Sequence, residues 1–214
     1  MNRNVAILSF LIFHVVHTHA QSHVERADTS FLGDEWYFSL TNDFYFGPDG
    51  GYFDPCFSAD HNHLHLEARY NMEDYQTGSL WYGYNMGGGS DKFGYYLTPM
   101  VGLIFGNTDG IAPDLILDVY YGRLDFYTDN EYLFDFSGIE NSYFYTWTEL
   151  TFAPFDWTHF GVAMQRTKIH QQASEVEYGF TLGFNYKFLS LTGYIFNPAI
   201  EEERYGFLSL GLGF

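Results

Sequence analysis

The sequence predicts an all-β protein that forms a single antiparallel transmembrane β-barrel of ten strands, with eight or twelve strands as alternatives. Most of the chain alternates apolar and polar residues with a period of two, which is typical of strands with two unlike faces. After the amino-terminal segment, no apolar run reaches the roughly 18 residues that a membrane-spanning helix needs. Aromatic residues make up 21% of the chain, whereas lysine and arginine together number nine. These observations favour strands over helices and an apolar environment for one face of the sheet.

The first twenty residues predict an export signal. Arg3 gives a positive start, an apolar run follows over 5–16, and the small residues Thr18 and Ala20 precede Gln21. This is the layout of a cleaved secretory signal peptide, and the run is too short for a membrane helix. We therefore divide the chain into a signal peptide (1–20), an N-terminal periplasmic lead (21–33) and a barrel (34–214).

Ten segments alternate apolar and polar residues and are the expected strands. Each strand is expected to begin and end within about two to four residues of the bounds given. In chain order they are 35–45, 59–70, 75–86, 93–105, 114–126, 142–153, 157–169, 175–186, 189–197 and 204–214. The clearest apolar faces are Trp36, Phe38, Leu40 and Phe44; Leu64, Leu66, Ala68 and Tyr70; Val176, Tyr178, Phe180, Leu182, Phe184 and Tyr186; and Leu208, Leu210, Leu212 and Phe214.

Alternation alone does not decide which face meets water, but residue size does. The polar faces are rich in Gly, Ser, Thr and Asn and poor in Lys, which suits a narrow lumen better than a solvated sheet face. The apolar faces are large and end in aromatic rings such as Trp36, Tyr84 and Trp157, as in the aromatic girdles of membrane barrels. We therefore expect the apolar face in lipid and the polar face inside.

The connections predict the orientation of the barrel. With the amino terminus in the periplasm, the expected outer loops are 46–58, 87–92, 127–141, 170–174 and 198–203. The expected periplasmic turns are 71–74, 106–113, 154–156 and 187–188, and most of them are shorter, as in known barrels.

Two local features bear on the strand count. Pro99 lies inside an expected strand and has no N–H for the ladder, so we expect irregular pairing there. The stretch 131–136 (EYLFDF) lies within a predicted loop, and it would either add a strand or extend a hairpin above the membrane.

The carboxyl terminus carries a family resemblance. The chain ends in Phe214 after leucines at alternate positions 208, 210 and 212. This resembles the C-terminal signature strand of bacterial outer-membrane β-barrel proteins. The resemblance implies a small barrel of unassigned activity in the outer membrane of a Gram-negative bacterium, whose last strand is bound by the barrel assembly machinery.

A row of polar residues occupies alternate positions within 59–70. With Leu64 and Leu66 facing lipid, this row would face the lumen, from the outer mouth at His61 to the periplasmic end at Arg69. The expected lumen-lining residues on this and other strands are Asp43, His61, His63, His65, Glu67, Arg69, Asp118, Glu149 and Gln165.

Three interpretations of the histidines remain open. A lumen face is polar by default, so simple lining is the first. The second is a metal site formed by His61, His63 and His65. Alternate strand positions lie about 7 Å apart, so two of these rings and a carboxylate such as Asp60 fit one ion better than all three rings. The third is catalysis by a histidine–carboxylate base, with His159 as a further candidate, although no serine stands in a recognised nucleophile motif.

The sequence favours a non-enzymatic outer-membrane barrel that is either structural or a narrow pore. With 27 acidic residues and a formal net charge of −18, its lumen would prefer cations. The alternatives are a membrane-embedded hydrolase acting on lipid or peptide and a soluble periplasmic binding barrel. We expect no cofactor. The expected partners are outer-membrane lipids and lipopolysaccharide, and the scarcity of basic residues argues against nucleic acid.

Overall fold

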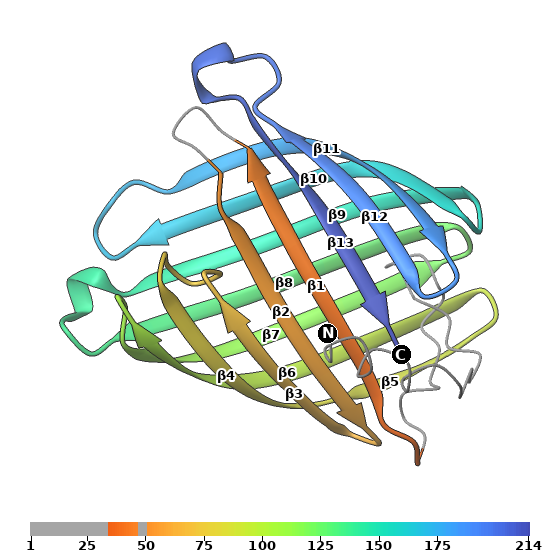
Figure 1. Ribbon diagram of the computed structural model, residues 1–214, viewed down its shortest axis with the longest axis horizontal. Coiled ribbons are helices and arrows are strands. Elements are labelled where there is room, and N and C mark those ends of the chain that lie inside the picture. Colours follow the sequence, from red (N-terminus) through yellow and green to blue (C-terminus); the bar gives the residue numbers. More distant parts are fainter. Residues whose placement is uncertain (1–33, 47–50) are drawn as a thin grey trace, which may run out of the picture.

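The computed structural model describes residues 34–46 and 51–214, which form a β-barrel (Figure 1). The predicted signal peptide (1–20) and periplasmic lead (21–33) lie outside the described residues. The strands are β1 (Tyr37–Phe46), β2 (Phe53–His61), β3 (Leu64–Tyr70), β4 (Thr77–Tyr84), β5 (Met86–Ser90), β6 (Phe93–Gly106), β7 (Gly110–Tyr121), β8 (Leu124–Asp135), β9 (Tyr143–Phe155), β10 (Thr158–Ile169), β11 (Glu175–Tyr186), β12 (Leu189–Phe196) and β13 (Tyr205–Gly213). Within the described ranges, no helix is long and apolar enough to cross a membrane.

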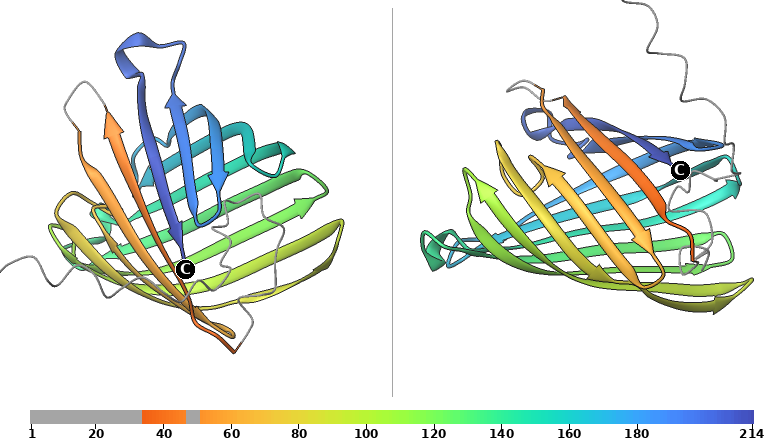
Figure 2. Two further views of the ribbon diagram at one scale, coloured as in Figure 1. Left: turned by 45° about the vertical axis from the view of Figure 1, so that its right-hand side comes forward. Right: turned by 60° about the horizontal axis from the view of Figure 1, so that its bottom comes forward.

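The sheet closes on itself. Neighbouring strands pair antiparallel in chain order, and β1 pairs with β13, so the two ends of the sheet meet (Figure 2). Both β4 and β5 pair with β6 and occupy one place in the ring, which gives a barrel of twelve strands. The ten-strand prediction is therefore wrong, and the twelve-strand alternative is confirmed. Most of the EYLFDF stretch lies in β8, so of its two expected roles it takes that of an additional strand.

The break between β4 and β5 has a simple cause. Both segments pair with β6 in the same register, on either side of a gap at Tyr84 and Asn85. That gap faces Thr98 and Pro99, and proline has no N–H to donate to a ladder. The irregular pairing expected at Pro99 is therefore an interruption of one long strand.

Prediction missed β2 and β8 because it assigned most of each to a loop. The chain reverses before β3 and before β8 through two-residue turns that contain Asn62 (φ 53°) and Gly122 (φ 63°). Neither turn has the Asn-Gly or Asp-Gly pair that most clearly marks a tight hairpin. The alternation therefore continued through both turns, and each hairpin was taken as one strand.

The two faces of the barrel are distributed as the sequence predicts. On β11, Phe180 is 57% exposed, whereas Thr181 beside it is 4% exposed and points inward. Large apolar side chains cover the outer surface along the whole ring, and the inward positions carry most of the buried polar residues. This distribution is the inverse of a soluble barrel, whose apolar face forms its core.

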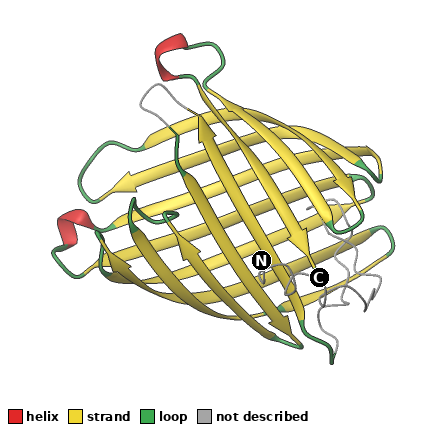
Figure 3. Cartoon of the chain, viewed as in Figure 1, coloured by secondary structure: helices red, strands yellow, loops and turns green. Residues whose placement is uncertain are grey.

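The two ends of the barrel differ in their connections. One end, the turn end, has two-residue turns at 62–63, 91–92, 122–123, 156–157 and 187–188. The opposite end, the loop end, has connections of three to eight residues, and both 3-10 helices, Ile139–Asn141 and Glu201–Glu203, lie there (Figure 3). The barrel begins and finishes at the turn end, where Phe38 and Phe214 exchange backbone hydrogen bonds of 2.7 and 2.8 Å.

The missed strands also reverse part of the predicted orientation. Segments 71–74 and 106–113, expected at the periplasmic end, lie at the loop end. Segment 87–92, expected as an outer loop, contains part of β5 and the 91–92 turn at the turn end. Each missed strand reverses the chain direction once, so the two reversals cancel from β9 onward. The later connections therefore alternate between the two ends as predicted.

Candidate functional site

The loop end of the barrel opens into a cavity of about 1410 Å³, which we call the vestibule. Its lining comes from loops and from strand residues in the loop-end half of the barrel. In the turn-end half, inward-facing side chains such as Asn85, Thr98, Glu149 and Thr192 are buried. The described interior is therefore wide and wet at one end and tightly filled at the other.

The vestibule is strongly acidic. Two arginines, Arg69 and Arg204, line it together with ten carboxylates. The carboxylates are Asp43, Asp54, Glu73, Asp74, Asp129, Glu131, Asp135, Glu177, Glu202 and Glu203. Burial raises the pKa of the Tyr52 phenol in the β1–β2 loop to about 12, and the nearby Asp54 and Asp43 carboxylates contribute to this rise. The lining thus favours positive solutes over negative ones.

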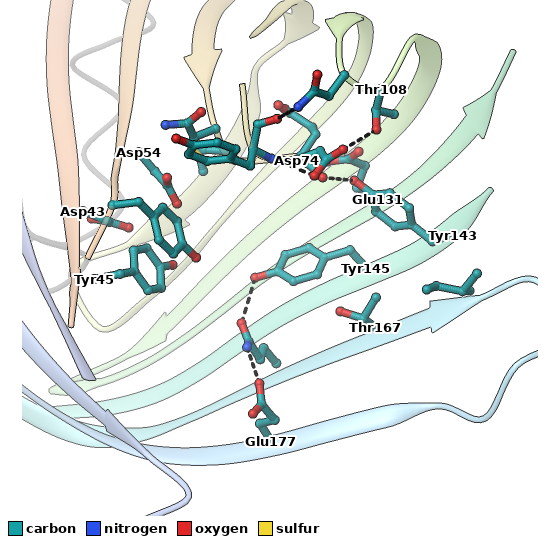
Figure 4. Close-up of a pocket in the computed structure, with 18 of the residues that line it drawn as sticks. Asp43, Tyr45, Asp54, Asp74, Thr108, Glu131, Tyr143, Tyr145, Thr167 and Glu177 are labelled. Carbon is teal, nitrogen blue, oxygen red and sulfur yellow. Dashed lines mark hydrogen bonds between the residues drawn. The ribbon is translucent and has the colours of Figure 1, made fainter. Parts of the chain in front are cut away.

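Strand alternation aims these side chains inward. On β2, Asp54 lies between the outward-facing Phe53 and Pro55, and on β8, Glu131 lies between Asn130 and Tyr132. Figure 4 shows Asp54 beside Asp43 on one side of the vestibule and Glu131 on another. The carboxylates therefore surround the space from several strands.

Arg69 anchors the floor of the vestibule. Its guanidinium group is buried and lies 4.3 Å from the centre of the Trp81 ring, which is a cation–π contact. Its four carboxylate partners, with nitrogen–oxygen distances, are Glu67 (2.5 Å), Asp114 (3.4 Å), Glu73 (3.9 Å) and Glu131 (3.9 Å). One cation thus holds together acidic side chains from β3, β7, β8 and the β3–β4 loop.

A second set of hydrogen bonds continues from Arg69 toward the turn end. The two ring nitrogens of His65 lie 2.7 Å from Asp60 and 2.9 Å from Glu67. Ionised carboxylates only accept hydrogen bonds, so this arrangement suits an imidazole that donates from both ring nitrogens. Asn85 donates to Asp60 (2.6 Å) and accepts from Thr98 (2.7 Å), which extends the network to β6.

The packing under Trp81 gives a direct test of this floor. A Cβ at Gly102 would lie 2.6 Å from the Trp81 ring, whereas a Cβ at Gly193 would meet its nearest atom at 3.4 Å. We expect Gly102→Ala to lower the free energy of unfolding by about 1–3 kcal/mol relative to Gly193→Ala, because the ring has to move. Urea unfolding in lipid vesicles measures the free energy of unfolding of both variants. Equal stability of the two variants would contradict the packing described.

The predicted lumen residues fall into three groups. Asp43, Arg69 and Gln165 line the vestibule. His65 and Glu67 belong to the buried network. Deeper in the barrel, Glu149 is buried and accepts hydrogen bonds from Trp147 (2.7 Å) and Tyr194 (2.9 Å), and Asp118 is half-buried on β7.

His61 and His63 do not join His65 in the interior. His61 ends β2 on its outward side and stacks on Trp36 at 4.9 Å, and His63 lies in the turn and stacks on Tyr84 at 4.9 Å. The cause is the 62–63 turn, which reverses the chain within the predicted row. Arg69 also lies toward the loop end, opposite to its expected place. No three His, Cys, Asp or Glu side chains among the described residues are grouped to hold a metal ion.

Sequence reasoning missed Asp54, Glu73, Glu131 and Glu177 as cavity residues. The first three fall in segments that were predicted as loops or turns, for which no inward-facing side was assigned. Part of the sequence pattern could have identified Glu131 as inward-facing. Asp129, Glu131 and Leu133 occupy alternate positions of β8 and therefore share one face of that strand.

Comparisons with known proteins bear on the fold. No protein-family model and no curated protein sequence matches the chain. The KdgM porin structure is 12% identical, with a TM-score of 0.60 over 82% of this chain and 98% of that chain. CdiB from Acinetobacter baumannii is 10% identical, with a TM-score of 0.38 over 84% of this chain and 60% of that one. A loop L8 deletion mutant of OmpT, an outer membrane protein of Vibrio cholerae, is 9% identical, with a TM-score of 0.40 over 84% and 98%. The KdgM match therefore shows that the chain has the fold of a bacterial outer-membrane β-barrel.

Proposed function

We propose that this chain, with its outer-membrane barrel fold, is a non-enzymatic outer-membrane protein that forms a narrow, cation-preferring pore. The observation that carries the proposal is the vestibule, a cavity of about 1410 Å³ lined by ten carboxylates and two arginines. Rings of acidic side chains at a pore entrance raise the local concentration of cations and repel anions. The likeness of the fold to that of KdgM, which is a porin, adds support for a channel.

The proposed orientation places the turn end in the periplasm and the vestibule outside the cell. Short turns at one end and longer loops at the other support it, since membrane barrels have short periplasmic turns and longer outer loops. In this arrangement the apolar outer surface contacts outer-membrane lipids and lipopolysaccharide. The signal peptide (1–20) directs export, and the strand that ends in Phe214 is the part bound by the assembly machinery.

The narrow part of the proposed pore is the buried network below the vestibule. Arg69 and His65 leave less room here than the vestibule above does. Only small ions and water would therefore pass between the side chains of this network. A conductance that is low for a twelve-stranded barrel follows from this narrowing.

Planar bilayers test the proposal. Purified, folded protein is expected to produce small, discrete current steps, whereas the same preparation unfolded by boiling is expected to produce none. Complete electrical silence of the folded protein would overturn the pore and leave a structural role. Large steps, like those of a wide general porin, would contradict the narrow lower half.

The two alternative functions have less support. A hydrolase at the rim would need a serine or carboxylate in contact with a rim histidine. Instead, His61 lies 3.1 Å from the carbonyl of Asp34 and His63 lies 2.8 Å from that of Asn85. A soluble binding barrel would leave a large apolar surface in water, which soluble proteins avoid.

A further inference from the structure

Several acids that line the vestibule have a buried carboxylate oxygen without a hydrogen-bond partner. Within the described chain, Asp54 Oδ1, Glu73 Oε2 and Glu131 Oε1 are buried and accept no hydrogen bond. Asp54 is 6% exposed and Glu131 is 5% exposed, and both line the vestibule. Buried charges are normally paired, so each such oxygen calls for a water or a ligand cation. The vestibule thus contains acceptors that the protein itself does not use.

The spacing of these groups argues against a single bare metal ion. Such an ion needs several ligand atoms within about 2–2.6 Å of one point. No three acidic, histidine or cysteine side chains of the described residues are grouped in that way. Figure 4 shows Asp54 and Glu131 apart, on different sides of the space. A suitable occupant therefore carries its positive charges at separate points.

Tyrosine rings provide the surface between these charges. Tyr45 and Tyr52 stack at 4.5 Å with an interplanar angle of 3°, and both line the vestibule. Figure 4 shows Tyr45 on the same side of the vestibule as Asp54. Tyr143 lines the cavity near Glu131, and Tyr145 lies between the two sides. Ring faces attract ammonium groups and also pack against methylene chains.

We propose that the vestibule is a binding site for a linear aliphatic polycation of the diamine or polyamine class, with ammonium groups at Asp54 and at Glu131 and a methylene chain along the tyrosines. The inference rests on the proposed function, since it names the class of solute that the pore entrance selects. The arginine-bound oxygens of the floor network stay with Arg69, and the ammonium groups bind the carboxylates of Asp54 and Glu131, which line the cavity.

Calorimetric titration of the full, folded protein in detergent tests the site, with spermine as the probe. We expect saturable binding with one spermine per barrel, at least about tenfold tighter than Mg²⁺ at equal ionic strength, because only spermine spans both sides. Equal affinity for Mg²⁺ and spermine would overturn the proposal, since it would indicate unspecific attraction of cations to an acidic cavity.

Variants locate the binding. Asp54→Asn is expected to weaken spermine binding about tenfold, and Asp54→Asn with Glu131→Gln more strongly. Tyr52→Leu lies in a loop, leaves the strands intact and should weaken binding about two- to fivefold. The matched control is Asp91→Asn in a turn at the other end, which should bind as the parent does. Unchanged affinity in both Asp54→Asn and Tyr52→Leu would contradict the site.

The outcomes separate this inference from the pore proposal, because the titration does not depend on conduction. A protein that is silent in bilayers yet binds spermine through Asp54 would refute the pore and retain the site. A conducting protein that binds spermine no better than Mg²⁺ would retain the pore and refute the site.

Discussion

Replacing Arg69 by leucine is expected to destabilise the barrel by about 3–5 kcal/mol, because removing one partner of a buried ion pair leaves uncompensated charge. The guanidinium nitrogens lie 2.5–3.9 Å from four carboxylates. Without it, these acids would repel one another inside the barrel. Since whole domains are stable by only about 5–15 kcal/mol, this loss is a large fraction of the total stability. Urea unfolding in vesicles and the gel shift between unboiled and boiled samples measure the loss.

The pH dependence shows whether electrostatic repulsion is the cause. Acidification protonates the freed carboxylates, so the stability difference between Arg69→Leu and the parent should shrink as the pH falls. Arg69→Lys keeps the charge but not the planar fork and should lose less stability than Arg69→Leu. Arg166→Leu, on an exposed side chain, is the control and should change stability by about 0.5 kcal/mol at most. A stability loss in Arg69→Leu that is the same at every pH would show that lost packing is responsible.

The sequence predicts the two faces of the barrel because each face depends only on local alternation. Phe180 and Thr181 are adjacent, and a strand must point them to opposite sides. The strand count depends on where the chain turns, and here prediction failed. The 62–63 turn pairs His61 with Leu64, which places His61 outward although His65 points inward. Two-residue turns without a strong sequence signal therefore changed both the count and the position of the histidines.

The site depends on contacts that no local pattern contains. Arg69 meets Asp114 from β7 and Glu131 from β8, which are brought beside it only by closure of the ring. Sequence reasoning could name Arg69 and Glu67 as inward-facing, because they alternate with apolar residues on one strand. It could not show that the acids gather at the loop end, since this requires the register and direction of every strand.

Ion selectivity should be the second large effect, and it depends on the vestibule carboxylates. Asp54→Asn, Glu202→Gln and Glu203→Gln together remove three of the ten acids and leave the partners of Arg69 in place. We expect this triple variant to lose a large part of the cation preference of the parent. Asp91→Asn with Asp156→Asn, in turns at the opposite end, removes two acids outside the vestibule and should preserve the cation preference.

The most direct measurement is the zero-current potential of the parent protein in a planar bilayer across a tenfold KCl gradient. A perfectly cation-selective pore gives about 59 mV, with the dilute side positive. We expect a potential of that sign that is a substantial fraction of this limit, and a clearly smaller one for the triple variant. A potential of zero or of opposite sign, or an equal potential in the triple variant, would contradict the claim that the acidic vestibule selects cations.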